Sequence, residues 1–284
     1  MSTLSKLPDL SQGKLKPSII ALDLDDTLLR DDLTISDYTV ETLRKATDEG
    51  IYVTLCSGRP DNAILPYVRQ LEIAGKQTGR FLIAQNGTSI TDLHLRKEIY
   101  SHLTDASSLI TAYREAKKMG LAAEVLSPST IYASVENEWT MRDKTVSKLK
   151  FEVVDDFEHF LMKRFPKIVI PGDPELIQKL LVRMKKLLGD TCLVMTTKPF
   201  YLEIQSKDSG KGEALMWLAS YIGLDTERVM SFGDSMNDVS MMQKAPLSVA
   251  MINGLDEIKA LARFNTEYTN NEDGVARFLN AYVL

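Results

Sequence analysis

The sequence has few of the features that mark secreted, membrane-spanning or nucleic-acid-binding proteins. Its 284 residues include only two cysteines, which excludes a disulfide framework as the main source of stability. Cys56 and Cys192 both lie in apolar runs, so we expect buried thiols in a reducing compartment. No run approaches the roughly 20 apolar residues that a membrane-spanning helix needs. The net charge of −5 argues against a general binder of nucleic acid or membrane surfaces.

The start of the sequence also lacks the apolar segment of a secretory signal. Met1 to Lys16 is polar and contains Pro8, so we expect residues 1–16 to form a mobile tail. With the low cysteine content, this predicts a cytoplasmic protein. Hydrophobic residues make up 44% of the chain and charged residues 26%, so a core of ordinary size is expected.

Two stretches, one near each end of the chain, alternate strand and helix patterns. Apolar runs typical of buried strands lie at 19–22, 51–56, 81–84, 229–232 and 248–251. Helical patterns lie at 36–49, 61–71, 211–222, 237–243, 255–262 and 274–282. Such alternation predicts a parallel sheet with helices on both faces. The predicted fold is therefore α/β, with a doubly wound, Rossmann-like parallel sheet formed by both ends of the chain.

The region between these stretches has the pattern of a separate α+β domain. Helices are expected at 105–118 and 174–188, and short strands at 88–90, 98–100, 122–126, 131–134, 167–170, 193–196 and 201–205. We therefore expect residues 17–87 and 199–284 to form one domain, interrupted by residues 88–198. The inserted segment has an ordinary length for a domain.

The first predicted strand ends in two carboxylates, Asp23 and Asp25. Side chains alternate along a strand, so these two would share a face if the strand continued. The carboxyl end of a strand is where open α/β sheets bind ligands. Neighbouring carboxylates repel each other and need a partner, for which a hard cation such as Mg²⁺ is suited. Apolar residues on both sides argue against a surface turn, so the pattern indicates phosphate chemistry.

Three further polar clusters follow predicted strands or begin a helix. They are Ser57-Gly58-Arg59, Lys211 in Ser209-Gly210-Lys211-Gly212, and Gly233-Asp234-Ser235-Met236-Asn237-Asp238. Each alone has a simple structural explanation, as a turn, a solvated lysine or a helix N-cap. Phosphoryl transfer explains all of them together, because it needs a nucleophile, a metal site, a cation beside the phosphate and hydrogen-bond donors to its oxygens.

In this order, the four clusters resemble the motifs of the haloacid dehalogenase superfamily. The chain is most similar to the Cof-type sugar-phosphatase branch. The resemblance spans about 19–279, and the inserted region resembles the family only in its size and position. Supporting residues are Asn86-Gly87, Leu202-Glu203-Ile204, Ala250-Met251 followed by Asn253, and the closing segment 269–276.

The resemblance implies a Mg²⁺-dependent phosphatase that hydrolyses small phosphomonoesters, either sugar phosphates or phosphorylated cofactors. Asp23 would be the nucleophile, forming a phosphoaspartate, and also a metal ligand. Asp25 would act as general acid and then general base, and would offer its backbone carbonyl to the metal. Asp234 would be the other carboxylate ligand. Asp238 would support the metal site from behind or bind through a water molecule.

The same resemblance implies a set of groups that hold the phosphate. Lys211 would neutralise charge on the phosphoryl group and on Asp23. The oxygens would be bound by the Ser57 hydroxyl, the backbone N–H groups of Leu24 and Gly58, and the Asn237 amide. Thr27 is expected to orient the loop rather than touch substrate. Many family members have glycine where this chain has Asp26, which we expect to face solvent.

The inserted region 88–198 corresponds to the family's cap, which selects the leaving group. Arg142, Lys144 and Lys198 are candidate contacts that the sequence does not rank. The expected partner is a small phosphorylated metabolite, with no nucleic acid or membrane, and the oligomeric state is not readable. Two alternatives stay open at this point. One is a phosphomutase of the same fold, and the other is a receiver-type protein that binds phosphate without turnover.

Overall fold

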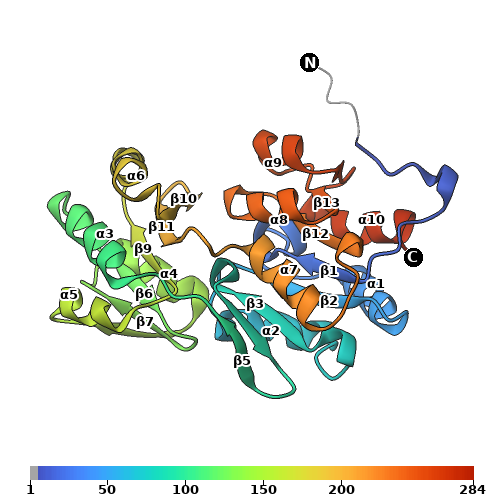
Figure 1. Ribbon diagram of the computed structural model, residues 1–284, viewed down its shortest axis with the longest axis horizontal. Helices are drawn as coiled ribbons and strands as arrows, with labels where there is room; N and C mark the ends of the chain where they lie inside the picture. Colours follow the sequence, from blue (N-terminus) through green and yellow to red (C-terminus); the bar gives the residue numbers. More distant parts are fainter. Residues whose placement is uncertain (1–5) are drawn as a thin grey trace. The chain divides into compact units, whose positions relative to one another are not determined.

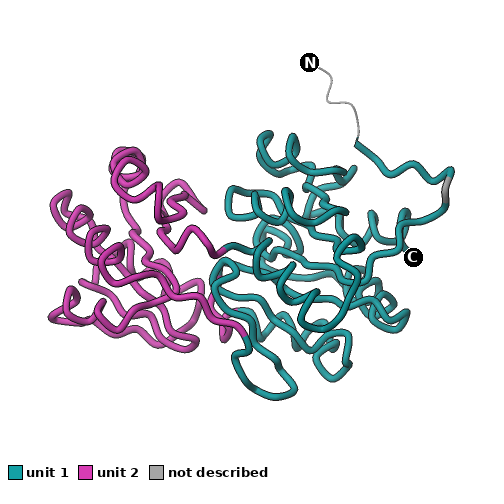
Figure 2. Tube along the Cα trace, viewed as in Figure 1, with its two compact units in different colours: residues 1–58, 64–99, 210–284 teal, residues 59–63, 100–209 magenta. Residues whose placement is uncertain are grey.

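A computed structural model describes residues 6–284, apart from the Gln12 side chain, and the chain folds into two compact units (Figures 1 and 2). Unit 1 contains the described residues of 6–58, 64–99 and 210–284. Unit 2 contains 59–63 and 100–209. The chain thus leaves unit 1 and returns to it, which is the arrangement expected for an inserted domain.

Unit 1 is built on an eight-stranded sheet in the order β14-β13-β12-β1-β2-β3-β4-β5. The strands from β14 to β3 pair in parallel, and β4 is antiparallel to β3. This confirms the predicted doubly wound α/β sheet. The strands are β1 (Ile19–Leu22), β2 (Tyr52–Cys56), β3 (Phe81–Ala84), β4 (Ser89–Asp92), β5 (Lys97–Ser101), β12 (Val229–Gly233), β13 (Leu247–Ala250) and β14 (Phe264–Asn265).

Helices cover both faces of this sheet. On one face, Leu43 and Leu279 pack with Phe232 of β12 in the larger core cluster. On the other, the Ser231 hydroxyl of the same strand donates to the Met241 carbonyl. The helices are α1 (Asp37–Asp48), α2 (Asp61–Leu71), α7 (Lys211–Tyr221), α8 (Val239–Lys244), α9 (Asp256–Leu261) and α10 (Gly274–Tyr282). Short helical turns are η1 (Leu10–Gln12), η2 (Leu24–Leu28), η3 (Gln77–Gly79), η4 (Gln85–Gly87), η6 (Thr226–Arg228), η7 (Met236–Asp238) and η8 (Asn270–Glu272).

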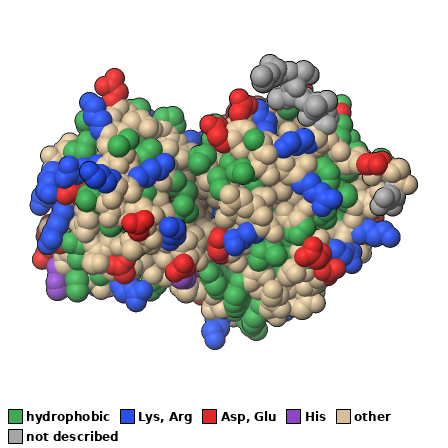
Figure 3. Space-filling model, turned by 45° about the horizontal axis from the view of Figure 1, so that its top comes forward, with side chains coloured by type: hydrophobic (Ala, Val, Ile, Leu, Met, Phe, Trp, Pro, Cys, Tyr) green, Lys and Arg blue, Asp and Glu red, His purple; other side chains and the backbone are tan. Residues whose placement is uncertain are grey.

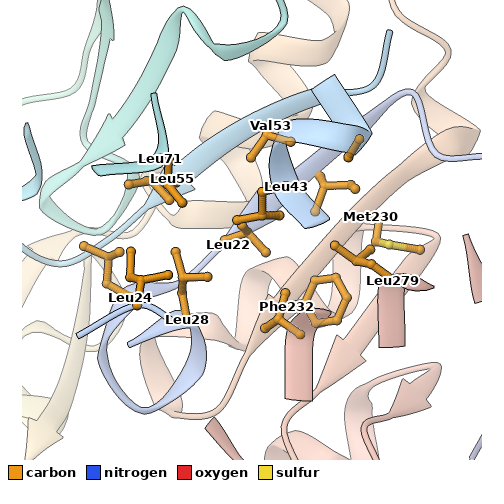
Figure 4. Close-up of a cluster of buried hydrophobic side chains, with 14 of the residues drawn as sticks. Leu22, Leu24, Leu28, Leu43, Val53, Leu55, Leu71, Met230, Phe232 and Leu279 are labelled. Atoms are coloured by element: carbon orange, nitrogen blue, oxygen red, sulfur yellow. The ribbon is translucent and has the colours of Figure 1, made fainter. Parts of the chain in front are cut away.

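Apolar side chains on either side of Asp23 anchor the end of β1 in the core (Figure 4). Leu22 and Leu24 are fully buried, and Leu28 joins them in the same cluster. Each buried leucine contributes roughly 1.5–3 kcal/mol, less the entropy of ordering it. The packing therefore fixes the chain immediately before and after Asp23.

Unit 2 contains a six-stranded, largely antiparallel sheet in the order β10-β11-β9-β6-β7-β8. Its core includes Leu109, Ile168, Ile177 and Leu180, from two helices and the central strand. The strands are β6 (Glu124–Leu126), β7 (Thr130–Ala133), β8 (Lys150–Val153), β9 (Lys167–Pro171), β10 (Cys192–Lys198) and β11 (Tyr201–Ser206). The helices are α3 (Ala106–Lys118), α4 (Glu138–Ser147), α5 (Phe157–Phe160), η5 (Leu161–Lys163) and α6 (Pro174–Leu188).

Unit boundaries differ from those expected at two places. The hairpin β4–β5, expected within the insert, extends the sheet of unit 1 beside β3. The strand β11, expected after the boundary at 198/199, belongs to the sheet of unit 2. It pairs on one side with β10 and on the other with β9, and these ladders satisfy its backbone groups.

The N-terminal segment differs from the expected mobile tail. Residues 1–5 of that segment lie outside the described residues. Beyond them, the Lys6 ammonium donates to the carbonyls of Lys259 and Ala260, and the Leu15 N–H donates to the Tyr282 carbonyl. Hydrogen bonds from the Lys6 side chain and from the Leu15 backbone therefore hold this polar segment, although it lacks an apolar pattern of its own.

Cys56 and Cys192 are buried free thiols, as predicted. Within 6–284, no helix combines the length and apolar composition that crossing a membrane requires. Acidic and basic side chains are interspersed on the face drawn in Figure 3, as the small net charge of −5 leads one to expect.

Candidate active site

The end of β1 places Asp23 at the carboxyl edge of the unit 1 sheet. Its backbone N–H donates to the Phe232 carbonyl of the neighbouring strand (3.1 Å), and its carbonyl accepts from the Leu28 N–H (3.3 Å). The second bond closes the wide turn η2. The Asp23 side chain is almost completely buried, although it carries a carboxyl group. A carboxylate in this environment needs a positive partner.

Lys211 is that partner. Its ammonium pairs with the Asp23 carboxylate and also donates to Asp238 (2.7 Å), and its side chain has no exposed surface. Burial acts against the charge on Lys211, but the two carboxylates outweigh it and raise the pKa of the lysine. Lys211 is therefore a fixed cation between two aspartates from different parts of unit 1.

Asp234 completes a cluster of three carboxylates with Asp23 and Asp238. One ligand oxygen from each lies within 4.8 Å of the others. Asp234 accepts from the buried Thr27 hydroxyl (2.9 Å), and its backbone N–H donates to Asp238 (2.9 Å). At Gly233, a Cβ would lie 2.6 Å from the Asp238 side chain, so only glycine permits this close approach.

The electrostatics of the cluster reflect crowded negative charge. Burial, reinforced by Asp238 and opposed by Lys211, raises the pKa of Asp23 to about 7. Burial, reinforced by Asp23 and Asp238, raises the pKa of Asp234 to about 9. A divalent cation would relieve this repulsion, and oxygen donors are the ligands that Mg²⁺ prefers. The residues present therefore fit such an ion.

A second group of polar residues surrounds the end of β2. Ser57 is buried, and its backbone N–H donates to the Ile83 carbonyl (3.0 Å). The Asn86 N–H donates to the Ser57 carbonyl (3.0 Å), and the Asn86 side-chain oxygen accepts from the Asn237 amide (3.0 Å). A Cβ on Gly58 would lie 2.7 Å from that Asn86 oxygen. The predicted phosphate-binding residues Ser57, Gly58 and Asn237 are thus brought together.

Comparison with known proteins identifies the family of the chain. Residues 20–279 match the haloacid dehalogenase-like hydrolase family. The chain belongs to this family. A putative phosphatase from Haemophilus influenzae is 33% identical to it, over 90% of this chain and 95% of the relative. A 5-amino-6-(5-phospho-D-ribitylamino)uracil phosphatase from Bacillus subtilis is 30% identical, over 94% and 98% respectively.

A solved structure shares the fold as well. A haloacid dehalogenase-like hydrolase from Bacteroides thetaiotaomicron superposes with a TM-score of 0.82 at 27% identity, covering 94% of this chain and 99% of that one. These matches confirm the family and the hydrolase class that the motifs predict. They also confirm the predicted fold class.

The remaining predicted residues of this haloacid dehalogenase-like hydrolase lie in the turn after β1. Asp25 is half-buried, and its charge contributes to the raised pKa of Asp23. Leu24 is buried in the core. Asp26 has a left-handed backbone (φ 61°) and is half-buried, and its carbonyl accepts from the Asn253 amide (2.7 Å). The expectation that Asp26 faces solvent therefore holds only in part.

Sequence reasoning missed a charged cluster on one face of the unit 2 sheet. Lys167 and Glu203 form a buried ion pair (2.6 Å), and Glu203 also accepts from the Thr197 hydroxyl. Glu124 is fully buried, and none of the described donors bonds its carboxylate oxygens. Burial, then the neighbouring Asp143, raises the pKa of Glu124 well above its usual range. Two facing carboxyl groups can hydrogen-bond only when one is protonated. The signal available in the sequence was that β6, β9 and β11 each carry one charged residue among apolar ones, which indicates a buried charged cluster.

The three basic residues proposed as leaving-group contacts have different environments. The Arg142 guanidinium lies over the rings of Trp139 (4.4 Å) and Phe200 (5.5 Å). The Lys144 ammonium lies over the Phe151 ring (5.5 Å). Lys198 is exposed at the end of β10. Cation–π contacts explain the positions of the first two without invoking a ligand.

Proposed function

We propose that this hydrolase is a Mg²⁺-dependent phosphatase that cleaves small phosphomonoesters through a phosphoaspartate on Asp23. The observation that carries the proposal is the buried arrangement of Asp23, Lys211, Asp234 and Asp238 at the carboxyl edge of the sheet. It combines a nucleophilic carboxylate, a fixed cation and an oxygen-ligand cluster within one family fold. Phosphoryl transfer requires these three elements together.

Asp23 and Asp234 would hold the metal ion, together with the backbone carbonyl of Asp25. When bound, Mg²⁺ would neutralise phosphate charge and orient the phosphoryl group for in-line attack. Asp238 would support the metal ligands rather than bind the ion directly, since its carboxylate accepts hydrogen bonds from the Lys211 ammonium and the Asp234 backbone N–H. All of these aspartates offer only oxygen atoms, in agreement with a hard cation.

In the first chemical step, the Asp23 carboxylate would attack phosphorus while the bond to the leaving oxygen breaks. Lys211 would keep Asp23 ionised, since its ammonium favours the charged form of the carboxyl group. Asp25 would donate a proton to the leaving alcohol. The N–H groups of Leu24 and Gly58, the Ser57 hydroxyl and the Asn237 amide would bind the phosphoryl oxygens.

In the second step, Asp25 would take a proton from a water molecule, which attacks phosphorus. The bond between phosphorus and the Asp23 oxygen breaks, and inorganic phosphate is released. General acid–base catalysis of this type contributes about 10²- to 10⁴-fold to the rate. Because the hydrolysis proceeds in two steps, the Asp25 carboxyl group can act as acid in the first and as base in the second.

We propose that unit 2 selects among phosphomonoesters. Its place as an insertion into unit 1 supports this role, because the family has its substrate-selecting cap at this place in the chain. The substrate named for the Bacillus subtilis relative, a phosphoribitylamino compound, belongs to the proposed class of small phosphorylated metabolites. The two free thiols support a cytoplasmic location.

The test is phosphate release from a panel of sugar phosphates and phosphorylated cofactors, with Mg²⁺ and with EDTA. The proposal predicts release from at least one substrate that EDTA abolishes and added Mg²⁺ restores. Release that persists in EDTA would contradict the metal requirement. Isomerised product that depends on a bisphosphate activator would support the mutase. A stable phosphoenzyme without turnover would support the receiver-type protein.

A further inference from the structure

The turn η4 at the end of β3 has an unusual backbone. Gln85, Asn86 and Gly87 have φ values of 50°, 58° and 81°, and all three are buried. Left-handed conformations cost a residue other than glycine about 1–3 kcal/mol, although asparagine tolerates them better than most. The Gln85 side-chain oxygen is also buried without a hydrogen bond to any described residue. Such a turn persists only because its surroundings hold it.

Asn86 connects two of the groups assigned to phosphate. Its backbone N–H donates to the Ser57 carbonyl, and its side-chain oxygen accepts from the Asn237 amide. The same oxygen lies against Gly58, where a Cβ would come within 2.7 Å. Asn86 therefore contacts both the turn after β2 and the loop after β12, which are far apart in the sequence.

Gly87 extends the same turn to the start of α7. Its φ of 81° suits glycine. A Cβ there would lie 2.1 Å from the Gly210 carbonyl oxygen and 2.6 Å from the Lys211 backbone nitrogen. The backbone of the turn thus packs directly against Gly210 and Lys211, where α7 begins. The turn therefore contacts the segments that carry Ser57, Asn237 and Lys211.

The bond from Asn86 determines how the Asn237 amide is oriented. The Asn237 side-chain oxygen accepts from the Ser235 hydroxyl (2.7 Å), and one of its two N–H bonds points to Asn86. Both ends of the amide are thereby fixed, since an amide flip would break both contacts. No described residue accepts from the other N–H, which leaves it available for a phosphate oxygen.

We infer that Asn86 is a positioning residue for phosphate binding, acting through the Asn237 amide. The inference rests on the proposed function, because Asn237 is assigned to the phosphate there. Asn86 itself does not touch the reacting atoms in this account. Its left-handed backbone places the side-chain oxygen beside Gly58, where it accepts from the Asn237 amide.

A double-mutant cycle tests the inference. Asn86→Gly removes the side chain, keeps the N–H that binds Ser57, and suits the positive φ. We expect it to lower kcat/KM for p-nitrophenyl phosphate about tenfold, the effect of one lost hydrogen bond. In an Asn237→Ala background the same change should cost less than about twofold. Equal losses in both backgrounds, or no loss in either, would overturn the inference.

The thermal stability of Asn86→Gly distinguishes a positioning role of Asn86 from a structural one. Because glycine adopts positive φ without strain, Asn86→Gly should keep the thermal unfolding midpoint within a few degrees of the wild type. Lys148→Gly is a matched control, since Lys148 is exposed and also left-handed (φ 56°). That variant should keep both stability and turnover. A loss of activity in Asn86→Gly that merely follows a loss of stability would contradict positioning.

Inorganic phosphate is the second probe, and it separates this inference from the proposed function. Its dissociation constant, measured by titration calorimetry with Mg²⁺ present, should rise about tenfold in Asn86→Gly and show the same coupling to Asn237. Coupled phosphate binding without turnover would support the inference and contradict the phosphatase. Turnover without coupling between Asn86 and Asn237, in either kcat/KM or phosphate binding, would support the phosphatase and contradict the inference. Failure of the wild type to bind phosphate would overturn the inference.

Discussion

Replacing Lys211 by methionine tests the buried charge cluster most severely. Methionine has a similar length and no charge, so Lys211→Met would leave Asp23 and Asp238 buried without their shared cation. Removing one partner of a buried ion pair costs about 3–5 kcal/mol, because the remaining charge stays desolvated. We therefore expect the free energy of unfolding of unit 1 to fall by about 4 kcal/mol near pH 8.

The size of this loss should depend on pH. Without metal, the pKa of Asp23 is already raised to about 7 in the folded protein, and losing the lysine would raise it further. The folded variant then binds protons that the unfolded chain does not, so its stability increases as pH falls. Lys211 keeps its proton across this range, because its own pKa is raised. The loss should be clearly smaller near pH 6 than near pH 8.

Urea unfolding followed by tryptophan fluorescence can measure this effect in unit 1 alone. The chain has two tryptophans, Trp139 in unit 2 and Trp217 on α7, the helix that begins with Lys211. A Trp139→Phe background makes Trp217 the only reporter. The protein is kept in EDTA, so that no divalent cation substitutes for the missing ammonium.

Lys244→Met provides the matched control in the same unit. The Lys244 side chain is 45% exposed, and its ammonium lies 3.5 Å from the Glu213 carboxylate. Losing this surface pair should lower the free energy of unfolding by less than about 1 kcal/mol. Adding Asp238→Asn to Lys211→Met should recover part of the loss, because it removes one unpaired carboxylate. If Lys211→Met is as stable as Lys244→Met, or if its loss of stability is the same at both pH values, Lys211 is not the cation that stabilises the two buried carboxylates.

Three further predictions concern other parts of the account. Asp25→Asn should lower kcat about 10²- to 10⁴-fold and retain phosphate binding, and kcat within tenfold of the wild type would contradict acid–base catalysis. Thr27→Val removes the hydroxyl that donates to Asp234, so the Mg²⁺ concentration giving half-maximal activity should rise about 10- to 100-fold; an unchanged value would exclude this supporting role. Burial, opposed by Lys167, raises the pKa of Asp143 to about 6, so ionisation between about pH 4 and pH 6 destabilises the folded state. Asp143→Asn should thus stabilise unit 2 near pH 8, by at most about 3 kcal/mol, but not near pH 4, as measured by Trp139 fluorescence.

The sheet of unit 1 was predictable because its buried strands are short apolar runs with clear ends, as at Ile19–Leu22. The helix α4 was not predicted, because its sequence lacks an apolar stripe, although Asn137 and Thr140 form a capping box at its start. Strand β8 was missed because it is largely exposed at the edge of its sheet. Both elements depend on tertiary contacts more than on local pattern.

Much of the candidate site was predictable for a related reason. The carboxyl ends of parallel strands meet at one edge of a sheet, which brings Asp23, Ser57 and Asp234 together. The role of Asn86 was not accessible, because it depends on a left-handed backbone and on a partner 151 residues away. The pairing of Lys167 with Glu203 likewise depends on the register of two antiparallel strands.

Phosphate release by Asp23→Asn, measured beside the wild type, shows whether Asp23 accepts the phosphoryl group. The substitution keeps the size of the side chain and removes its nucleophilic carboxylate. We expect turnover by the wild type with Mg²⁺ and none by the variant, whose unit 1 should remain folded as judged by Trp217 fluorescence. Turnover by a folded Asp23→Asn variant at a rate near that of the wild type would show that Asp23 is not the nucleophile.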